Sequence, residues 1–224
     1  MPLYYAALLG FSTVTRLLLD AGADVNAQGG RYGNALQAAS YKGHEQVVKM
    51  LLDQGADVNA QGRLDGNALY EASAVGHEQV VKMLLDAGAD VNAQGGLDGN
   101  ALYSASERGH EQVVKMLLDA GAEVNARGVL YGNALQAASY KGHKQVVKTL
   151  LNQGADVNAQ GGLDGVALYA ASERGHEQVV KMLLDEGANV NGQGGDYGNA
   201  LQAASAGGHE QVVKMLLDAG AHQH

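Results

Sequence analysis

Histidine–glutamate pairs recur along the chain and are the first residues to test for chemistry. The run HEQVV, which begins at His44, matches the front half of the zinc-binding pattern HExxH. In that pattern two histidines four residues apart on a helix hold the metal, but Val48 stands where the second histidine is required. We therefore expect these histidines to pack and hydrogen-bond at a turn, and we expect neither a metal nor another cofactor.

The remaining reactive patterns are incomplete. Glycine-rich runs such as GGRYG and GGLDG lack the GxGxxG spacing of a dinucleotide site and are followed by no Lys-Ser or Lys-Thr. The sequence contains no GxSxG and no cysteine, which removes two common sources of a catalytic nucleophile. The pattern thus indicates a protein that is not an enzyme.

The charge balance narrows the class of partner. With 15 Lys and Arg against 24 Asp and Glu, the formal net charge is −9. An acidic chain has no long-range attraction for nucleic acid or for anionic lipid. No run of 18 apolar residues occurs, so the sequence predicts no membrane span. We expect a protein partner.

An internal period organises the chain. The glycine before Ala-Leu recurs every 33 residues from Gly33, and the Gly-His pair recurs at the same interval from His44. Such a period is typical of solenoids, whose units stack in one row. We therefore expect one array over residues 1–224, without a second domain. Its units are a partial one at 1–32, whole ones at 33–65, 66–98, 99–131, 132–164 and 165–197, and a truncated one at 198–224.

Each unit is predicted to contain two helices and a loop. In residues 33–65, Asn34 is a good helix N-cap and Gly43 ends the first helix. A second helix is expected from about His44 to Gln54, because its valines and leucines recur at spacings of three and four. Gly55 then occupies the place of a left-handed cap, and the following residues read as a turn.

The repeated pattern A-L-x-x-A-S-x-x-G-H-x-x-V-V-x-x-L-L-x-x-G-A-D-V-N-A resembles the ankyrin repeat over the whole chain. The resemblance implies an all-α solenoid of helix–turn–helix units with hairpin-like loops and a concave groove that binds proteins. The opening T-P-L-H of the family is altered, because Asn34 replaces the threonine and Ala35 the proline. The amino-acid sequence of the units most resembles the near-identical ankyrin arrays of fungal NLR-like receptors.

Differences between units point to a recognition surface. Residues 33–65 and 66–98 match at 27 of 33 positions, and most of the changes fall where the family geometry places the groove. The outer helices instead repeat Glu45, Lys49 and Asp53 nearly unchanged, as a surface maintained for solubility would. Recent duplication is the alternative, since 33–65 and 132–164 match at 29 of 33 positions.

The candidate partner-binding residues are aromatic, charged or apolar side chains on the inner helices and loop tips. Tyrosine and arginine are frequent interface anchors, and exposed apolar groups at loop tips suggest contact. The set is Arg31, Tyr32, Tyr41, Lys42, Leu64, Tyr70, Leu97, Tyr103, Glu107, Arg108, Leu130, Tyr131, Tyr140, Lys141, Leu163, Tyr169, Glu173, Arg174 and Tyr197.

The sequence thus favours a cytoplasmic, non-enzymatic protein–protein interaction module, which could be the ligand-sensing segment of a larger receptor. A structural spacer, an assembly element or a consensus-like repeat protein without an evolved ligand is the alternative. Leu9 and Phe11 near one end, and an unmodified last helix at the other, predict apolar ends. We expect a piece of a longer array, and either a monomer or weak end-to-end self-association.

Overall fold

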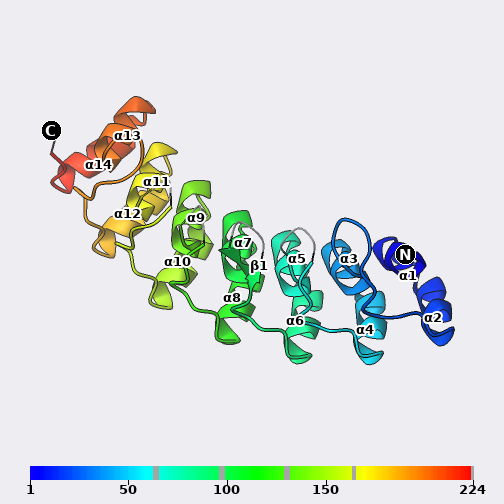
Figure 1. The fold of residues 1–224 in the computed structure, drawn as a ribbon. Coiled ribbons are helices and arrows are strands. Elements are labelled where there is room, and N and C mark those ends of the chain that lie inside the picture. Colours follow the sequence, from blue (N-terminus) through cyan, green and yellow to red (C-terminus); the bar gives the residue numbers. More distant parts are fainter. Residues whose placement is uncertain (63–65, 96–98, 129–131, 163–164, 223–224) are drawn as a thin grey trace.

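The computed structural model describes residues 1–62, 66–95, 99–128, 132–162 and 165–222, and within them the chain forms seven successive helix pairs (Figure 1). The inner helices are α1 (Pro2–Leu8), α3 (Ala35–Lys42), α5 (Ala68–Val75), α7 (Ala101–Arg108), α9 (Ala134–Lys141), α11 (Ala167–Glu173) and α13 (Ala200–Ala206). The outer helices are α2 (Ser12–Asp20), α4 (Glu45–Asp53), α6 (Glu78–Asp86), α8 (Glu111–Asp119), α10 (Lys144–Asn152), α12 (Glu177–Asp185) and α14 (Glu210–Asp218). The predicted all-α solenoid is confirmed.

The inner helices begin and end where the local chemistry dictates. The Asn34 side chain accepts a hydrogen bond from the Gln37 backbone N–H, and the Gln37 side chain accepts one from the Asn34 N–H, which forms a capping box. Gly43 ends α3 in the left-handed conformation with φ of 72°. At α11 the cap residue is Val166, which supplies no side-chain hydrogen bond.

The Gly-His pairs lock each unit to the one before it. The His77 Nε2 lies 3.0 Å from the Tyr41 backbone oxygen, 36 residues earlier in the chain. The same contact, at 2.9 to 3.2 Å, joins the other five Gly-His histidines to the preceding unit. The His77 imidazole also lies against Gly43, the glycine of the Gly-His pair one unit earlier. A Cβ added to Gly43 would come within 2.5 Å of the His77 ring. The predicted packing and hydrogen bonding of these histidines is confirmed.

The core runs between the two helix layers. In α4 the side chains of Val47, Val48 and Leu51 are buried, and the equivalent residues of every later outer helix up to α12 are buried as well. They pack against Leu36 and its equivalents from the inner helices. A unit on its own could not cover both faces, so stacking supplies the apolar burial that stabilises the array.

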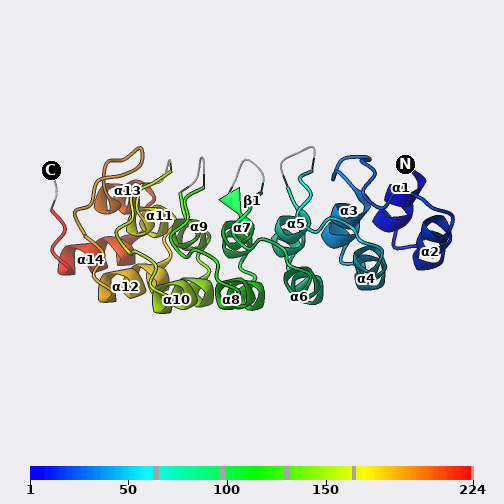
Figure 2. The same ribbon diagram turned by 60° about the horizontal axis from the view of Figure 1, so that its bottom comes forward.

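The described parts of the loops between units lie on the side of the inner helices (Figure 2). One loop has two strands, β1 (Gln94–Gly95) and β2 (Gly99–Asn100), which pair antiparallel. A ladder of asparagines ties successive loops together. For example, Asn59 Oδ1 accepts a hydrogen bond from the Asp90 N–H at 2.8 Å, and Asn59 Nδ2 donates one to the Gly88 oxygen at 3.2 Å.

The stack is curved. Inner helices pack more closely against their neighbours than outer helices do, so the row bends with the inner helices on its concave side (Figure 1). At the ends, apolar side chains such as Phe11, Leu17 and Leu217 are exposed. Within the described ranges no helix is long and apolar enough to cross a bilayer.

Candidate functional site

The C-terminal ends of four inner helices line an open groove on the concave side. Its volume is about 640 Å³, and its walls come from α3, α5, α7 and α9 together with one histidine of the following turn. The lining residues are Tyr41, Ala74, Val75, Glu107, Arg108, His110 and Lys141. Four predicted site residues, one or two from each of three different units, thus meet on one surface.

Aromatic rings and cations alternate along this surface. The Arg174 guanidinium lies 4.1 Å from the centroid of the Tyr140 ring, and the Lys141 ammonium lies 5.6 Å from the same centroid. Lys42 is placed similarly over Tyr41, at 5.3 Å. Cation–π contacts of this kind hold long side chains in place, which lowers the entropy that they lose on binding.

The groove face is basic although the chain is acidic. Lys42, Arg108 and Lys141 each occupy the last turn of an inner helix and are exposed. A cation in this position is favourable for the helix dipole, which by itself would explain a lysine or arginine there. Glu107 lies 3.9 Å from Lys141 and neutralises one of these charges in part.

The first loop extends the groove. The Tyr32 ring stacks on the Tyr41 ring with centroids 4.4 Å apart, and burial together with the neighbouring Tyr41 raises the pKa of the Tyr32 phenol. Glu71 of α5 is partly buried, and this burial raises the pKa of its carboxyl, while the charges of Arg31 and Arg108 act in the opposite direction. The loop and the inner helices therefore share one electrostatic environment.

Not every candidate residue is available to a partner. Tyr103 is 5% exposed and Tyr169 is 1% exposed. The Tyr169 hydroxyl accepts a hydrogen bond from the Tyr197 N–H of the next loop at 3.3 Å, so Tyr169 helps to hold that loop in place. Because both side chains are buried, the structure does not expose Tyr103 and Tyr169 to a partner, contrary to the expectation from the sequence.

The other candidates fall into three groups. Tyr70, in the slot equivalent to Tyr169, and Glu173 are partly buried, whereas Tyr197 is exposed near the C-terminal end of the array. Five candidates lie outside the described residues: Leu64, Leu97, Leu130, Tyr131 and Leu163.

The candidate set from the sequence omits three lining residues of the groove, Ala74, Val75 and His110, and also the nearby Glu71. Val75 is exposed in the middle of the groove, between the cations of the neighbouring units, and Glu71 lies nearby. Both positions differ between units 33–65 and 66–98, so the same comparison of repeats held the signal. Neither is aromatic or basic, which is why interface statistics did not select them.

The groove is suited to binding. The described residues hold no group of three His, Cys, Asp or Glu side chains that could bind a metal ion. The recurrent serines at 40, 73, 106, 139 and 172 are buried within the stack, away from the surface. What the groove offers is apolar area, aromatic faces and charges from successive units.

Comparisons with known proteins agree with the architecture. A family model described as "Ankyrin repeats (3 copies)" matches residues 3–95, 69–161 and 136–224. The crystal structure of the human ASB11 ankyrin repeat domain superimposes with a TM-score of 0.87 at 26% identity, over 100% of both chains.

A curated fungal protein is also similar over a short stretch. The Azaphilone pigments biosynthesis cluster protein L of Monascus ruber is 58% identical over 50 residues, which are 19% of this chain and 11% of that protein. Ankyrin repeats are generally protein–protein interaction modules. The three matches of the family model together extend over nearly the whole length, and the chain therefore belongs to the ankyrin-repeat family.

Proposed function

We propose that the array binds a protein through the concave groove lined by Tyr41, Val75, Arg108 and Lys141. One observation carries this proposal. Side chains that differ among otherwise near-identical units come together in one open groove, while the buried frame is repeated. Duplication alone accounts for the sameness of the units, but not for the place where their differences gather.

The chemistry of the groove indicates the kind of contact. Lys141 and Arg174 both lie near the Tyr140 ring, and tyrosine and arginine are frequent anchors of protein interfaces. A standard interface buries about 800 Å² on each partner, which several adjacent units of this array can supply. Truncation of a central anchor typically costs about 2 kcal/mol or more in binding free energy.

Two double variants test the proposal. Tyr140→Ala with Arg108→Ala removes one lining side chain of the groove and the tyrosine beside the lining residue Lys141. Glu111→Ala with Lys115→Ala removes the partly exposed ion pair of an outer helix, whose atoms lie 2.6 Å apart. We expect the affinity for a captured protein to fall by a factor of about thirty or more in the first double variant, and to change little in the second.

The assay is affinity capture from a lysate of the source, with the wild-type chain and both variants as baits and quantitative mass spectrometry as the readout. Circular dichroism of each bait checks that the fold is kept. Equal loss from both variants, or loss from the outer pair alone, would show that the binding face is wrong. A lysate from which the wild-type chain captures nothing specific would favour the spacer alternative.

A wider role belongs to the same proposal. Within a larger NLR-like receptor, the array would be the ligand-sensing segment, an idea that rests on the resemblance of its repeats to those of fungal NLR-like receptors. The similarity to a short part of a longer fungal protein agrees with a fungal source. We also propose a cytoplasmic location, in keeping with the cysteine-free composition. Weak end-to-end association through Phe11, Leu17 and Leu217 stays a prediction that sedimentation at millimolar concentration would test.

A further inference from the structure

One outer helix departs from the sequence that the others share. Among the outer helices that follow a Gly-His pair, α10 reads KQVVKTLLN, whereas each of the others reads EQVVKMLLD. Three of the few differences between units 33–65 and 132–164 fall in this helix, where Lys144, Thr149 and Asn152 replace Glu, Met and Asp. The outer surface is therefore not uniform.

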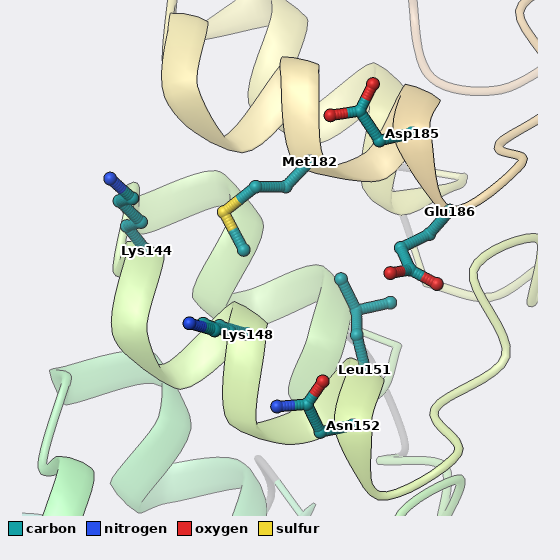
Figure 3. Close-up of a pocket in the computed structure, with 7 residues that line it drawn as sticks. All are labelled: Lys144, Lys148, Leu151, Asn152, Met182, Asp185 and Glu186. Atoms are coloured by element: carbon teal, nitrogen blue, oxygen red, sulfur yellow. The ribbon is translucent and has the colours of Figure 1, made fainter.

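Two of these three departures, Lys144 and Asn152, line a cleft on the convex side (Figure 3). It has a volume of about 300 Å³ between α10 and α12. Its lining residues are Lys144, Lys148, Leu151, Asn152, Met182, Asp185 and Glu186. The lysine ammonium groups lie on one side of the cleft, the two carboxylates lie on the other, and the apolar side chains of Leu151 and Met182 lie between them (Figure 3).

Both walls of this cleft are specific to it. On α10, Lys144 and Asn152 replace acidic residues of the other units. Directly after α12, Glu186 places a carboxylate where the remaining units have alanine or glutamine, as in Ala120 and Gln153. One wall has thus gained positive charge and the facing wall negative charge.

The change on α10 works against helix stability. Lys144 stands at the N-terminal end of its helix, where an acidic residue is favoured, and it lies four residues before Lys148. Like charges at this spacing repel, whereas Glu111 and Lys115 at the same positions of α8 form an ion pair. In the described part of the chain, neither Lys144 nor Lys148 has a carboxylate oxygen within 4.0 Å. Local conflicts of this kind mark functional sites.

We propose that the cleft between α10 and α12 is a second protein-binding site, separate from the concave groove. Its ligand is a short peptide segment with acidic, aliphatic and basic side chains in order. The acidic group pairs with Lys144 and Lys148, the aliphatic one covers Leu151 and Met182, and the basic one pairs with Asp185 and Glu186. From Lys144 to Asn152 the helix advances about 12 Å, a length that four to five extended residues span.

Methionine methyl groups report on this site with built-in controls. Met182 lines the cleft, and Met83 and Met116 hold the same place in units that keep the shared sequence. The protein is labelled with 13C at the methionine methyls and titrated with the capped pentapeptide Glu-Glu-Leu-Lys-Lys. We expect a saturable shift of the Met182 signal, with Met83 and Met116 unchanged, and about tenfold weaker binding of Gln-Gln-Leu-Gln-Gln.

Matched variants are supplied by the chain itself. Lys144→Glu with Asn152→Asp and Glu186→Ala restores residues that fold in the equivalent places of α6 and after α8, so it removes the charge pattern with little risk to the fold. We expect about tenfold weaker binding at Met182. The opposite transfer, Glu78→Lys with Asp86→Asn and Ala120→Glu, should make Met116 respond to the peptide.

Several results would overturn the proposal. They are no shift at Met182, equal shifts at Met83 and Met116, equal binding of the glutamine peptide, or no effect of the restoring variant. The groove variant Tyr140→Ala with Arg108→Ala must leave the Met182 response intact. If the Met182 response is intact and the lysate capture fails, the cleft proposal is supported and the groove proposal is not. If the capture succeeds and the Met182 signal does not shift, the groove proposal is supported and the cleft proposal is not.

Discussion

Replacement of Gly109 by alanine should destabilise the array more than the same change at Gly121. Both glycines follow a helix of the same unit and have positive φ, 76° and 92°. A Cβ at Gly109 would lie 2.7 Å from two atoms of the His143 ring, whereas nothing lies within 4 Å of a Cβ at Gly121. The comparison therefore separates backbone strain from the contact between units.

The expected costs follow from these two contributions. A left-handed conformation costs an alanine about 1 to 2 kcal/mol, which applies to both variants. The collision with His143 adds about 1 to 3 kcal/mol at Gly109, because the ring cannot move away without losing its Nε2 contact with the Glu107 oxygen at 2.9 Å. We expect losses in the free energy of unfolding of about 2 to 5 kcal/mol for Gly109→Ala and about 1 to 2 kcal/mol for Gly121→Ala.

Urea unfolding followed by circular dichroism measures both losses. In a solenoid each unit contacts only its neighbours, so the Gly109 variant should also broaden or split the transition at one interface. Removal of the ring in Gly109→Ala with His143→Ala should give a smaller loss than the sum of the single variants. Equal losses for the two glycine variants, or strict additivity with His143→Ala, would refute the idea that the His143 ring packed on Gly109 couples the two units.

Two further predictions concern the ladder of asparagines and the pH dependence of the stack. Asn92→Ala removes two hydrogen bonds, one with the Glu123 N–H at 2.8 Å and one with the Gly121 oxygen at 3.2 Å. We expect it to lower the free energy of unfolding in urea by about 1 to 2 kcal/mol. As a control, Gln112→Ala changes an exposed side chain and should alter this free energy by less than about 0.5 kcal/mol. Burial lowers the pKa of His176 below its ordinary 6.5. The folded chain therefore binds a proton at His176 less readily than the unfolded chain does. The urea midpoint should fall as the pH is lowered from about 6.5 through the pKa of the folded state. The fall should be smaller in His176→Gln, and an equal fall would contradict this assignment.

The local architecture could be predicted because its causes lie close together in the chain. Asn34 at the N-cap and Gly43 at the left-handed cap fix the ends of α3 within one segment of sequence. The valine and leucine spacing of α4 marks its buried face in the same way. The fixed period then makes every unit confirm the others, which is why helix positions and the family resemblance both hold.

The candidate site could be predicted only in part. Tyr32 and Tyr169 are the same residue type, but the first stacks on Tyr41 at the groove and the second is covered by the next loop. Composition could not separate them, because exposure depends on a unit that lies about 30 residues further on. Val75 became a groove residue for the same reason, since its neighbours come from α3, α7 and α9.

By itself, the sequence determined the period, the helix caps, the apolar stripe and the Gly-His pairs, because backbone hydrogen bonding and helical periodicity act over a few residues. Only the tertiary structure decided which side chains share a surface. Stacking brings Tyr41, Arg108 and Lys141 of three units into one groove, and it places Lys144 and Glu186 toward the two ends of one outer cleft. Such juxtapositions arise from packing between units, and no local pattern contains them.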